Sequence, residues 1–144
     1  MNRIPLLVPD LPPLEALMGR IQHINASGRA SNFGPLVTEL EQRLGDALGC
    51  YVVTAANATL ALELALTVLD MAPGSTVACP ALTFPATATA IARAGHVPYF
   101  VDVELSTWCA AANQILPLGG SGNRHGENAE AAVMVSAFGA GLSP

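Results

Sequence analysis

A predicted strand that turns at once into a helix is the feature of this sequence best suited to bind a ligand. Residues 51–54 are apolar and β-branched, as short buried strands are, and residues 58–69 are rich in alanine and leucine, which favour helix. Either Asn57 or Thr59 can cap the first helical turn. Free backbone amides and the positive end of the helix dipole would then attract an anion such as a phosphate. An ordinary capped turn without a ligand is the alternative, and the local sequence leaves both open.

The titratable side chains do not form a recognisable catalytic set. All six basic residues are arginines, so the sequence contains no lysine. A glycine-rich stretch at residues 119–128 therefore lacks the lysine of a P-loop, and we expect a surface loop there. The three histidines have no carboxylate at a useful spacing and are expected to be structural: His23, His96 and His125. We predict no catalytic residue within this chain.

The three cysteines, Cys50, Cys79 and Cys109, are widely spaced and include no CxxC pair. This pattern predicts small buried apolar side chains in a reducing compartment, and it argues against both a disulfide set and a metal site. No other cluster of residues suggests a metal.

Composition excludes several kinds of partner. The net charge is −5 and no basic cluster occurs, so neither nucleic acid nor an anionic membrane is an expected partner. Residues 71–92 carry no charge, but four helix-breaking prolines and glycines rule out a membrane helix there. The N-terminal apolar run is too short for a signal peptide, and we expect a cytoplasmic protein.

The elements that must position the ligand-binding turn alternate in type along the chain. Apolar spacing predicts one helix over residues 14–27, and a second that begins at Pro35, buries Val37, Leu40, Leu44 and Leu48, and stops at Gly49. Strands are predicted at 51–55, 76–79, 97–103 and 131–136, with Pro98 indicating an edge strand and Pro85 opening a further helix. Strands that alternate with helices predict an α/β fold with a mostly parallel sheet, whose ligands lie at the carboxyl ends of the strands. Those ends hold residues 56–59, Thr83 and Phe84, Asp102 and Ser136.

Four stretches in this order resemble motifs of the DegT/DnrJ/StrS family of aminotransferases that use pyridoxal 5′-phosphate. They are SNFGPLV at residues 31–37, NATLAL at 57–62, PALTFPAT at 80–87 and AGHVPYFVDV at 94–103. The resemblance extends over about residues 6–139 and implies a fold type I aminotransferase. Residues 1–34 would supply an N-terminal helix and an active-site loop, and residues 35–144 part of the three-layer large domain, truncated.

The resemblance also implies roles for individual residues. In such enzymes the turn that matches Ala58 and Thr59 binds the cofactor phosphate through backbone amides and the hydroxyl. The position of Phe84 carries an aromatic ring that stacks on the pyridine ring, although plain packing of Phe84 stays open. The loop that matches Asn32, Phe33 and Gly34 lines the site near the substrate, often across a homodimer.

The implied activity is transfer of an amino group, with glutamate as the expected donor, to a nucleotide-linked keto-sugar. Two family features are missing from these 144 residues, however: the Schiff-base lysine and the aspartate that pairs with the pyridine nitrogen. Ser136 also stands where many relatives have histidine. This chain alone is therefore predicted to be inactive. The alternative is a non-catalytic remnant or phosphate-binding module that acts through a protein partner, and a nucleotide-binding Rossmann unit is a poorer fit because no GxGxxG follows a strand.

Overall fold

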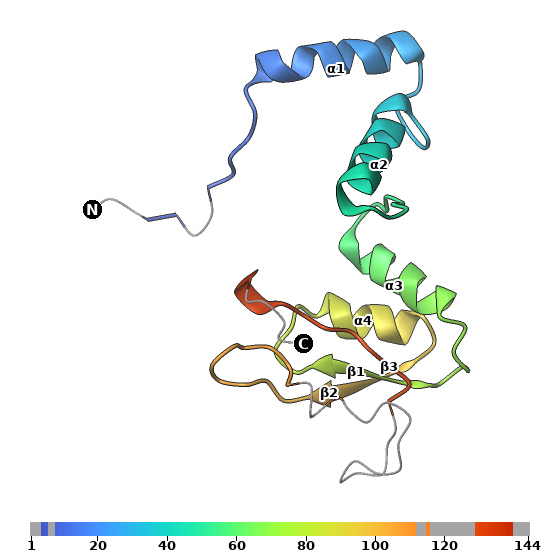
Figure 1. The fold of residues 1–144 in the computed structure, drawn as a ribbon, viewed down its shortest axis with the longest axis vertical. Coiled ribbons are helices and arrows are strands. Elements are labelled where there is room, and N and C mark those ends of the chain that lie inside the picture. Colours follow the sequence, from blue (N-terminus) through green and yellow to red (C-terminus); the bar gives the residue numbers. More distant parts are fainter. Residues whose placement is uncertain (1–3, 6–7, 112–114, 116–128, 140–144) are drawn as a thin grey trace. The chain divides into compact units, whose positions relative to one another are not determined.

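The computed structural model describes residues 4–5, 8–111, 115 and 129–139, and the chain divides into two units, residues 1–54 and 55–144 (Figure 1). The first unit holds two helices, α1 (Leu14–Ser27) and α2 (Pro35–Leu48). Each ends at a glycine in the left-handed region, Gly28 with φ 65° and Gly49 with φ 67°. Glycine adopts this conformation without a steric penalty, which confirms the two predicted helix ends.

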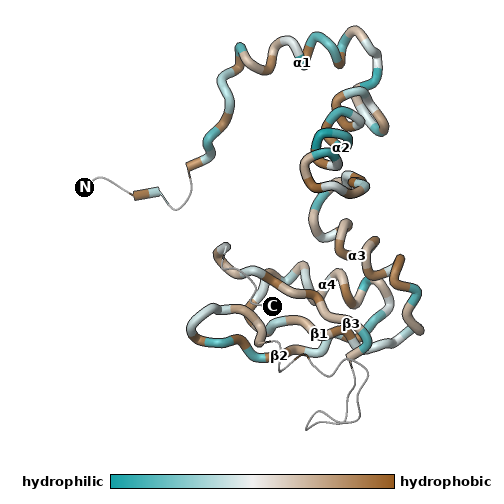
Figure 2. Tube along the Cα trace, viewed as in Figure 1, coloured by the Kyte–Doolittle hydropathy of each residue, from teal (hydrophilic) through white to brown (hydrophobic). Residues whose placement is uncertain are grey.

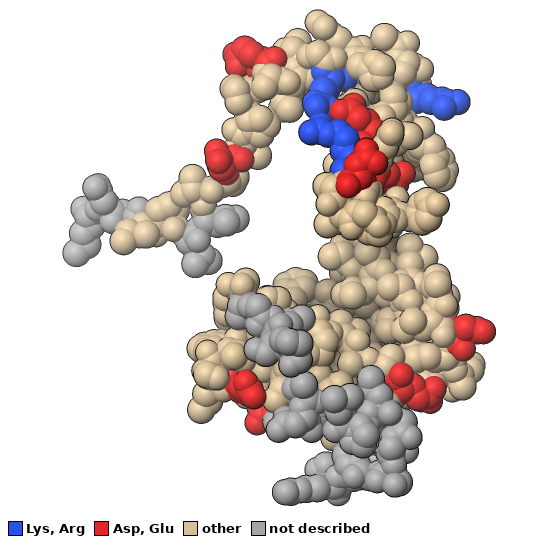
Figure 3. All heavy atoms as spheres, in the orientation of Figure 1, with Lys and Arg blue, Asp and Glu red and all other residues tan. Residues whose placement is uncertain are grey.

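The predicted buried stripe of α2 is wrong. Among the described residues α2 buries none of its side chains, and Leu40, Leu44 and Leu48 are 49%, 39% and 68% exposed. An apolar stripe is buried only where another layer covers it, and in the described part of this unit α2 is covered only by α1 and by the loop that follows α2. One ion pair joins the two helices, with Glu39 of α2 lying 3.3 Å from Arg20 of α1, where Figure 3 shows red and blue atoms together. Glu39 also lies 3.5 Å from Arg43 within α2. Exposed pairs of this kind add little stability.

The predicted strand at residues 51–55 is also wrong. These residues have no regular secondary structure and pair with no strand in the described part of the chain. Strand-forming side chains do not make a strand without a neighbour to complete the ladder. Their only described anchor is Glu41, whose Oε1 accepts hydrogen bonds from the Thr54 amide and the Thr54 hydroxyl, both at 2.8 Å.

This anchor should respond to pH. Hydrogen bonds from the Thr54 amide and then the Thr54 hydroxyl hold the pKa of Glu41 below its ordinary value. The contribution of these bonds to stability is therefore fully present above the ordinary glutamate pKa and is lost as the pH falls through the lowered pKa. We expect the NMR shift of the Thr54 amide to titrate below the ordinary glutamate range and to stay flat in Glu41→Gln. A midpoint at or above that range would contradict the assignment.

The second unit contains a parallel three-stranded sheet in its described part. The strand β1 (Thr76–Pro80) lies between β2 (Val97–Val101) and β3 (Ala131–Ala132), with Ala78 opposite both Tyr99 and Ala132. Three of the predicted strands are thus confirmed in position and direction. Pro98 lies on an edge strand of the described sheet, where its missing N–H leaves no ladder bond unmade.

Two of these strands are shorter than predicted, for identifiable reasons. On the edge of β1 that faces β3, the even-numbered residues form the backbone hydrogen bonds. The carbonyl groups of Thr76 and Ala78 accept from the amides of Glu130 and Val133, respectively. The next donor on that side would be Pro80, which has no N–H, so the ladder to β3 stops. The strand β2 ends at Val101 because the Asp102 carboxylate accepts from the amide of Val103, and the chain then folds back on itself.

Helices α3 (Ala58–Val68) and α4 (Ala86–Arg93) pack on one another and cover one face of the sheet (Figure 1). Alternate residues of β1 point to opposite faces. Val77 and Cys79 pack with Leu66 of α3 and Ile91 of α4, whereas Ala78 packs on the other face with Val101, Ala110, Ile115 and Ala129. Arg93 and Glu63 link the two helices at 2.7 Å. In Figure 2 α3 is drawn mostly in white to brown, which agrees with its alanine- and leucine-rich sequence. The predicted α/β class with a parallel sheet is confirmed.

The cysteine prediction is confirmed for two residues and wrong for one. Cys79 and Cys109 are 0% and 5% exposed, and burial raises the pKa of the Cys79 thiol. Cys50 is exposed because it follows Gly49 in the loop after α2. The glycine-rich residues 119–128, with His125, lie outside the described residues. None of the helices described is long and apolar enough to cross a membrane.

Candidate functional site

The first turn of α3 has the open amides that an anion site needs. The side-chain oxygen of Asn57 accepts a hydrogen bond from the Leu60 amide at 3.0 Å, and the backbone carbonyl of Asn57 accepts one from the Ala61 amide at 3.1 Å. Asn57, and not Thr59, is therefore the cap. The amides of Ala58 and Thr59 donate to no atom of the described residues. Two N–H groups are thus left at the positive end of the helix, with Ala58 exposed and Thr59 half-buried.

A groove of about 390 Å³ lies beside Phe84. It is formed by two segments that follow parallel strands, and its lining residues are Leu82, Thr83, Phe84, Pro85, Val135, Ser136, Ala137 and Phe138. The structure therefore brings together two of the predicted strand ends, as parallel strands require. The Phe84 side chain is 77% exposed, so its ring is open to a ligand. Ala58 and Thr59 are not among the residues that line this groove, so their expected proximity to Phe84 stays a prediction.

A second aromatic ring faces the same groove. Phe138 has φ 53°, in the left-handed region that side chains other than glycine rarely adopt. Its ring meets the ring of Trp108 edge to face, with centroids 5.6 Å apart. Phe138 is not predicted as a site residue from the sequence, because nothing in the sequence around it shows that it lines the same groove as Phe84.

The predicted loop at residues 31–34 lies in the first unit. Gly34 is buried at the start of α2, where an added Cβ would lie 2.9 Å from the carbonyl oxygen of Arg29, so only glycine fits. Asn32 is exposed, and Phe33, with φ 56°, is 83% exposed. Phe33 lines a cavity of about 550 Å³, together with His23, Ser27, Arg29, Pro35, Thr38, Glu39 and Gln42. An exposed ring beside an arginine suits a ligand with a flat or anionic group.

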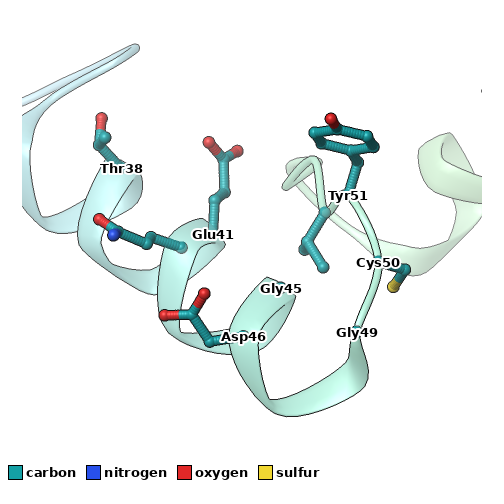
Figure 4. Close-up of a pocket in the computed structure, with 9 residues that line it drawn as sticks. Thr38, Glu41, Gly45, Asp46, Gly49, Cys50 and Tyr51 are labelled. Carbon is teal, nitrogen blue, oxygen red and sulfur yellow. The ribbon is translucent and has the colours of Figure 1, made fainter.

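Another cavity, of about 730 Å³, was not predicted from the sequence. It lies between α2 and the loop that follows, and Thr38, Glu41, Gln42, Gly45, Asp46, Gly49, Cys50, Tyr51 and Val52 line it (Figure 4). Gly45 permits this fold-back, since a Cβ there would lie 2.9 Å from the Cys50 carbonyl oxygen. Its two carboxylates, on Glu41 and Asp46, would repel a phosphate. The chemistry of this cavity therefore does not match the expected ligand.

Comparison with known proteins gives one consistent answer. The DegT/DnrJ/EryC1/StrS aminotransferase family matches residues 14–117. EpsN of Bacillus subtilis, provisionally named a pyridoxal phosphate-dependent aminotransferase, is 32% identical over 128 residues, which cover 85% of this chain and 33% of EpsN. The UDP-2-acetamido-2-deoxy-3-oxo-D-glucuronate aminotransferase of Pseudomonas aeruginosa is 42% identical over 76 residues, which cover 52% of this chain and 21% of that enzyme.

Solved structures agree with the sequence matches. The crystal structure of a DegT/DnrJ/EryC1/StrS aminotransferase from Brucella abortus superposes with a TM-score of 0.78 at 32% identity, covering 90% of this chain and 35% of that one. The chain thus spans about a third, or less, of the length of the relatives it matches.

Proposed function

The chain belongs to the DegT/DnrJ/EryC1/StrS aminotransferase family, and from that premise we propose that it supplies the cofactor-binding elements of an enzyme that aminates a nucleotide-linked keto-sugar. The expected amino donor is glutamate, and the expected assembly is a homodimer. The name of the Pseudomonas relative includes a UDP-linked keto-sugar, which supports this substrate class. The family match supports the reaction class.

The single observation that carries this proposal is the open first turn of α3. Pyridoxal phosphate, when bound, supplies an electron sink for amino-group transfer. Its phosphate is a dianion, which fits the two unpaired amides of Ala58 and Thr59 and the Thr59 hydroxyl at a helix N-terminus. Its flat ring fits the exposed face of Phe84. The residues present therefore fit the phosphate and the ring.

The roles that this chain can perform are binding and orientation. The α3 amides would hold the phosphate, and Phe84 would set the plane of the ring. The apolar walls of the groove, Val135 and Phe138 among them, would exclude water from one side. The sequence has no lysine, so it does not provide the amine expected to carry the proton in such enzymes.

A second candidate function rests on that same composition. These 144 residues, which contain no lysine, can bind a phosphate compound without carrying out amino transfer. In this case the chain would act as a non-catalytic phosphate-binding module with a protein partner. The two candidates share the α3 site and differ in whether a keto-sugar is converted when the chain is part of its complete assembly.

The binding site can be tested with two ligands that differ only in the ring. We expect Thr59→Val to weaken both pyridoxal phosphate and inorganic phosphate by about tenfold or more, because a hydrogen bond to a charged group is lost. Phe84→Ala should weaken pyridoxal phosphate about tenfold and leave inorganic phosphate unchanged, because only stacking is removed. Isothermal titration calorimetry with each ligand measures both. Thr67→Val, on α3 but away from its first turn, is the matched control. Equal loss of both ligands in Phe84→Ala would contradict the assignment of the ring.

The cap residue gives a separate prediction. Asn57→Asp keeps an oxygen that accepts from the Leu60 amide, so α3 should stay as stable as before. The added negative charge should nevertheless repel a bound phosphate and lower its affinity. Asn57→Ala should instead destabilise the helix by about 1 kcal/mol. Circular dichroism and phosphate titration distinguish the two variants. A phosphate affinity unaffected by Asn57→Asp would place the anion elsewhere.

A further inference from the structure

The side-chain hydroxyls of Thr83 and Thr87, on either side of Phe84 in the sequence, form a hydrogen bond with each other. Thr83 Oγ1 and Thr87 Oγ1 lie 2.8 Å apart, and Thr87 is 5% exposed in the first turn of α4. A buried hydroxyl needs a partner, since an unsatisfied one costs free energy. Thr83 meets this need from the segment that leaves β1. The bond thus ties the residue before Phe84 to the helix that follows it.

The backbone of Phe84 is fixed from the helix side as well. Its carbonyl accepts from the Thr87 amide at 3.0 Å, and Pro85 restricts the conformation of the residue before it. The Pro85 carbonyl accepts from both the amide and the hydroxyl of Thr89, at 3.1 and 2.9 Å. On the strand side, the Ala81 amide donates to Val101 at 2.8 Å. Between Ala81 and Phe84, the Thr83–Thr87 hydrogen bond therefore holds the connecting residues in place.

We propose that Thr83 and Thr87 are positioning residues for Phe84, and that their hydroxyl pair presents the Phe84 ring to a flat ligand in the groove. This inference rests on the proposed function, in which Phe84 stacks on the cofactor ring. An exposed aromatic side chain on a loose turn would lose conformational entropy on binding. Fixing its backbone in advance reduces that loss. The pair acts through the backbone of Phe84; Thr83 lines the groove and Thr87 does not, so Thr87 tests the positioning role apart from direct contact.

The test begins with the mobility of the ring, which needs no cofactor. Incorporated 4-fluorophenylalanine labels the four phenylalanines of the chain, and the Phe84 signal is the one lost in Phe84→Leu. We expect Thr87→Val and Thr83→Val each to change the ¹⁹F transverse relaxation of Phe84, while Thr87→Ser, which keeps the hydroxyl, does not. Thr67→Val is the matched control, because the Thr67 hydroxyl donates to the Glu63 carbonyl within α3.

Affinity for pyridoxal phosphate supplies the second readout. Each valine variant should bind it about three- to tenfold more weakly, the loss expected for one hydrogen bond, and the double variant no more weakly than either single one. Affinity for inorganic phosphate should not change. An unchanged Phe84 relaxation in both valine variants would overturn the inference. Unchanged affinity in Phe84→Ala is a different failure, which would overturn the role of Phe84 in the proposed function. Thermal melts of each variant separate these results from loss of folding.

Discussion

Treatment of the 144-residue chain with pyridoxal phosphate and then borohydride is expected to leave its mass unchanged. Borohydride fixes the compound to a protein only where its aldehyde has condensed with a primary amine. The sequence has no lysine, and its six arginines stay protonated at any ordinary pH. The α-amine of Met1 is the one amine left. We therefore expect reversible binding through phosphate and ring contacts, without a covalent product and without amino transfer by this chain alone.

Intact-protein mass spectrometry measures this directly. A lysine-containing protein treated in parallel should gain pyridoxyl groups, which shows that the reduction worked. Peptide mapping would assign any partial label to Met1. A stoichiometric adduct, or amino transfer to a keto-sugar nucleotide by the isolated chain, would contradict the prediction.

The largest effect on folding is expected from Ile91→Ala. Ile91 is 0% exposed and packs with Leu66, Val77 and Cys79 between helix and sheet. Removing a buried isoleucine side chain beyond Cβ costs about 2–5 kcal/mol, because apolar contacts are lost and a cavity remains. The α4 and β1 amides should then exchange with solvent at least about thirtyfold faster, if they exchange by opening of this core.

Hydrogen exchange followed by mass spectrometry on peptides from α4 and β1 tests this expectation. Leu64→Ala is the control on α3, because Leu64 is 58% exposed and substitutions at exposed positions change stability by about 0.5 kcal/mol or less. Equal protection in Ile91→Ala and Leu64→Ala would show that the α3–α4 packing does not hold the sheet together.

Local sequence predicted those parts of the fold that depend on local chemistry. The start of α2 at Pro35 and the ends of α1 and α2 at glycine follow from backbone geometry, and each was predicted to the residue. Residues 51–55 depend instead on a strand that lies elsewhere in the chain, and local sequence cannot report whether such a partner is present. The early end of β3 depends on Pro80 in a different strand, which is likewise a property of the pair.

The same distinction applies to the candidate site. Parallel topology predicted that Phe84 and Ser136 would lie close together, and the groove confirms it. The position of Phe138 could not be predicted, because it depends on a left-handed backbone conformation that the neighbouring residues do not indicate. The sequence does not decide between Asn57 and Thr59 as the cap, because both side chains can accept from an amide; the observed hydrogen bond from Leu60 to Asn57 decides.

The distribution of the cysteines gives the chain a built-in chemical label for each unit. Cys50, in residues 1–54, is exposed, whereas Cys79 and Cys109, in residues 55–144, are buried. Alkylation proceeds through the thiolate, so a buried thiol with a raised pKa reacts slowly until the structure around it opens. A maleimide dye would therefore attach first at Cys50, and the rate of the later two attachments would record how often the sheet opens. A spectroscopic probe can therefore be attached to the first unit, and the opening rate of the second unit can be measured from the alkylation of its cysteines, without any substitution.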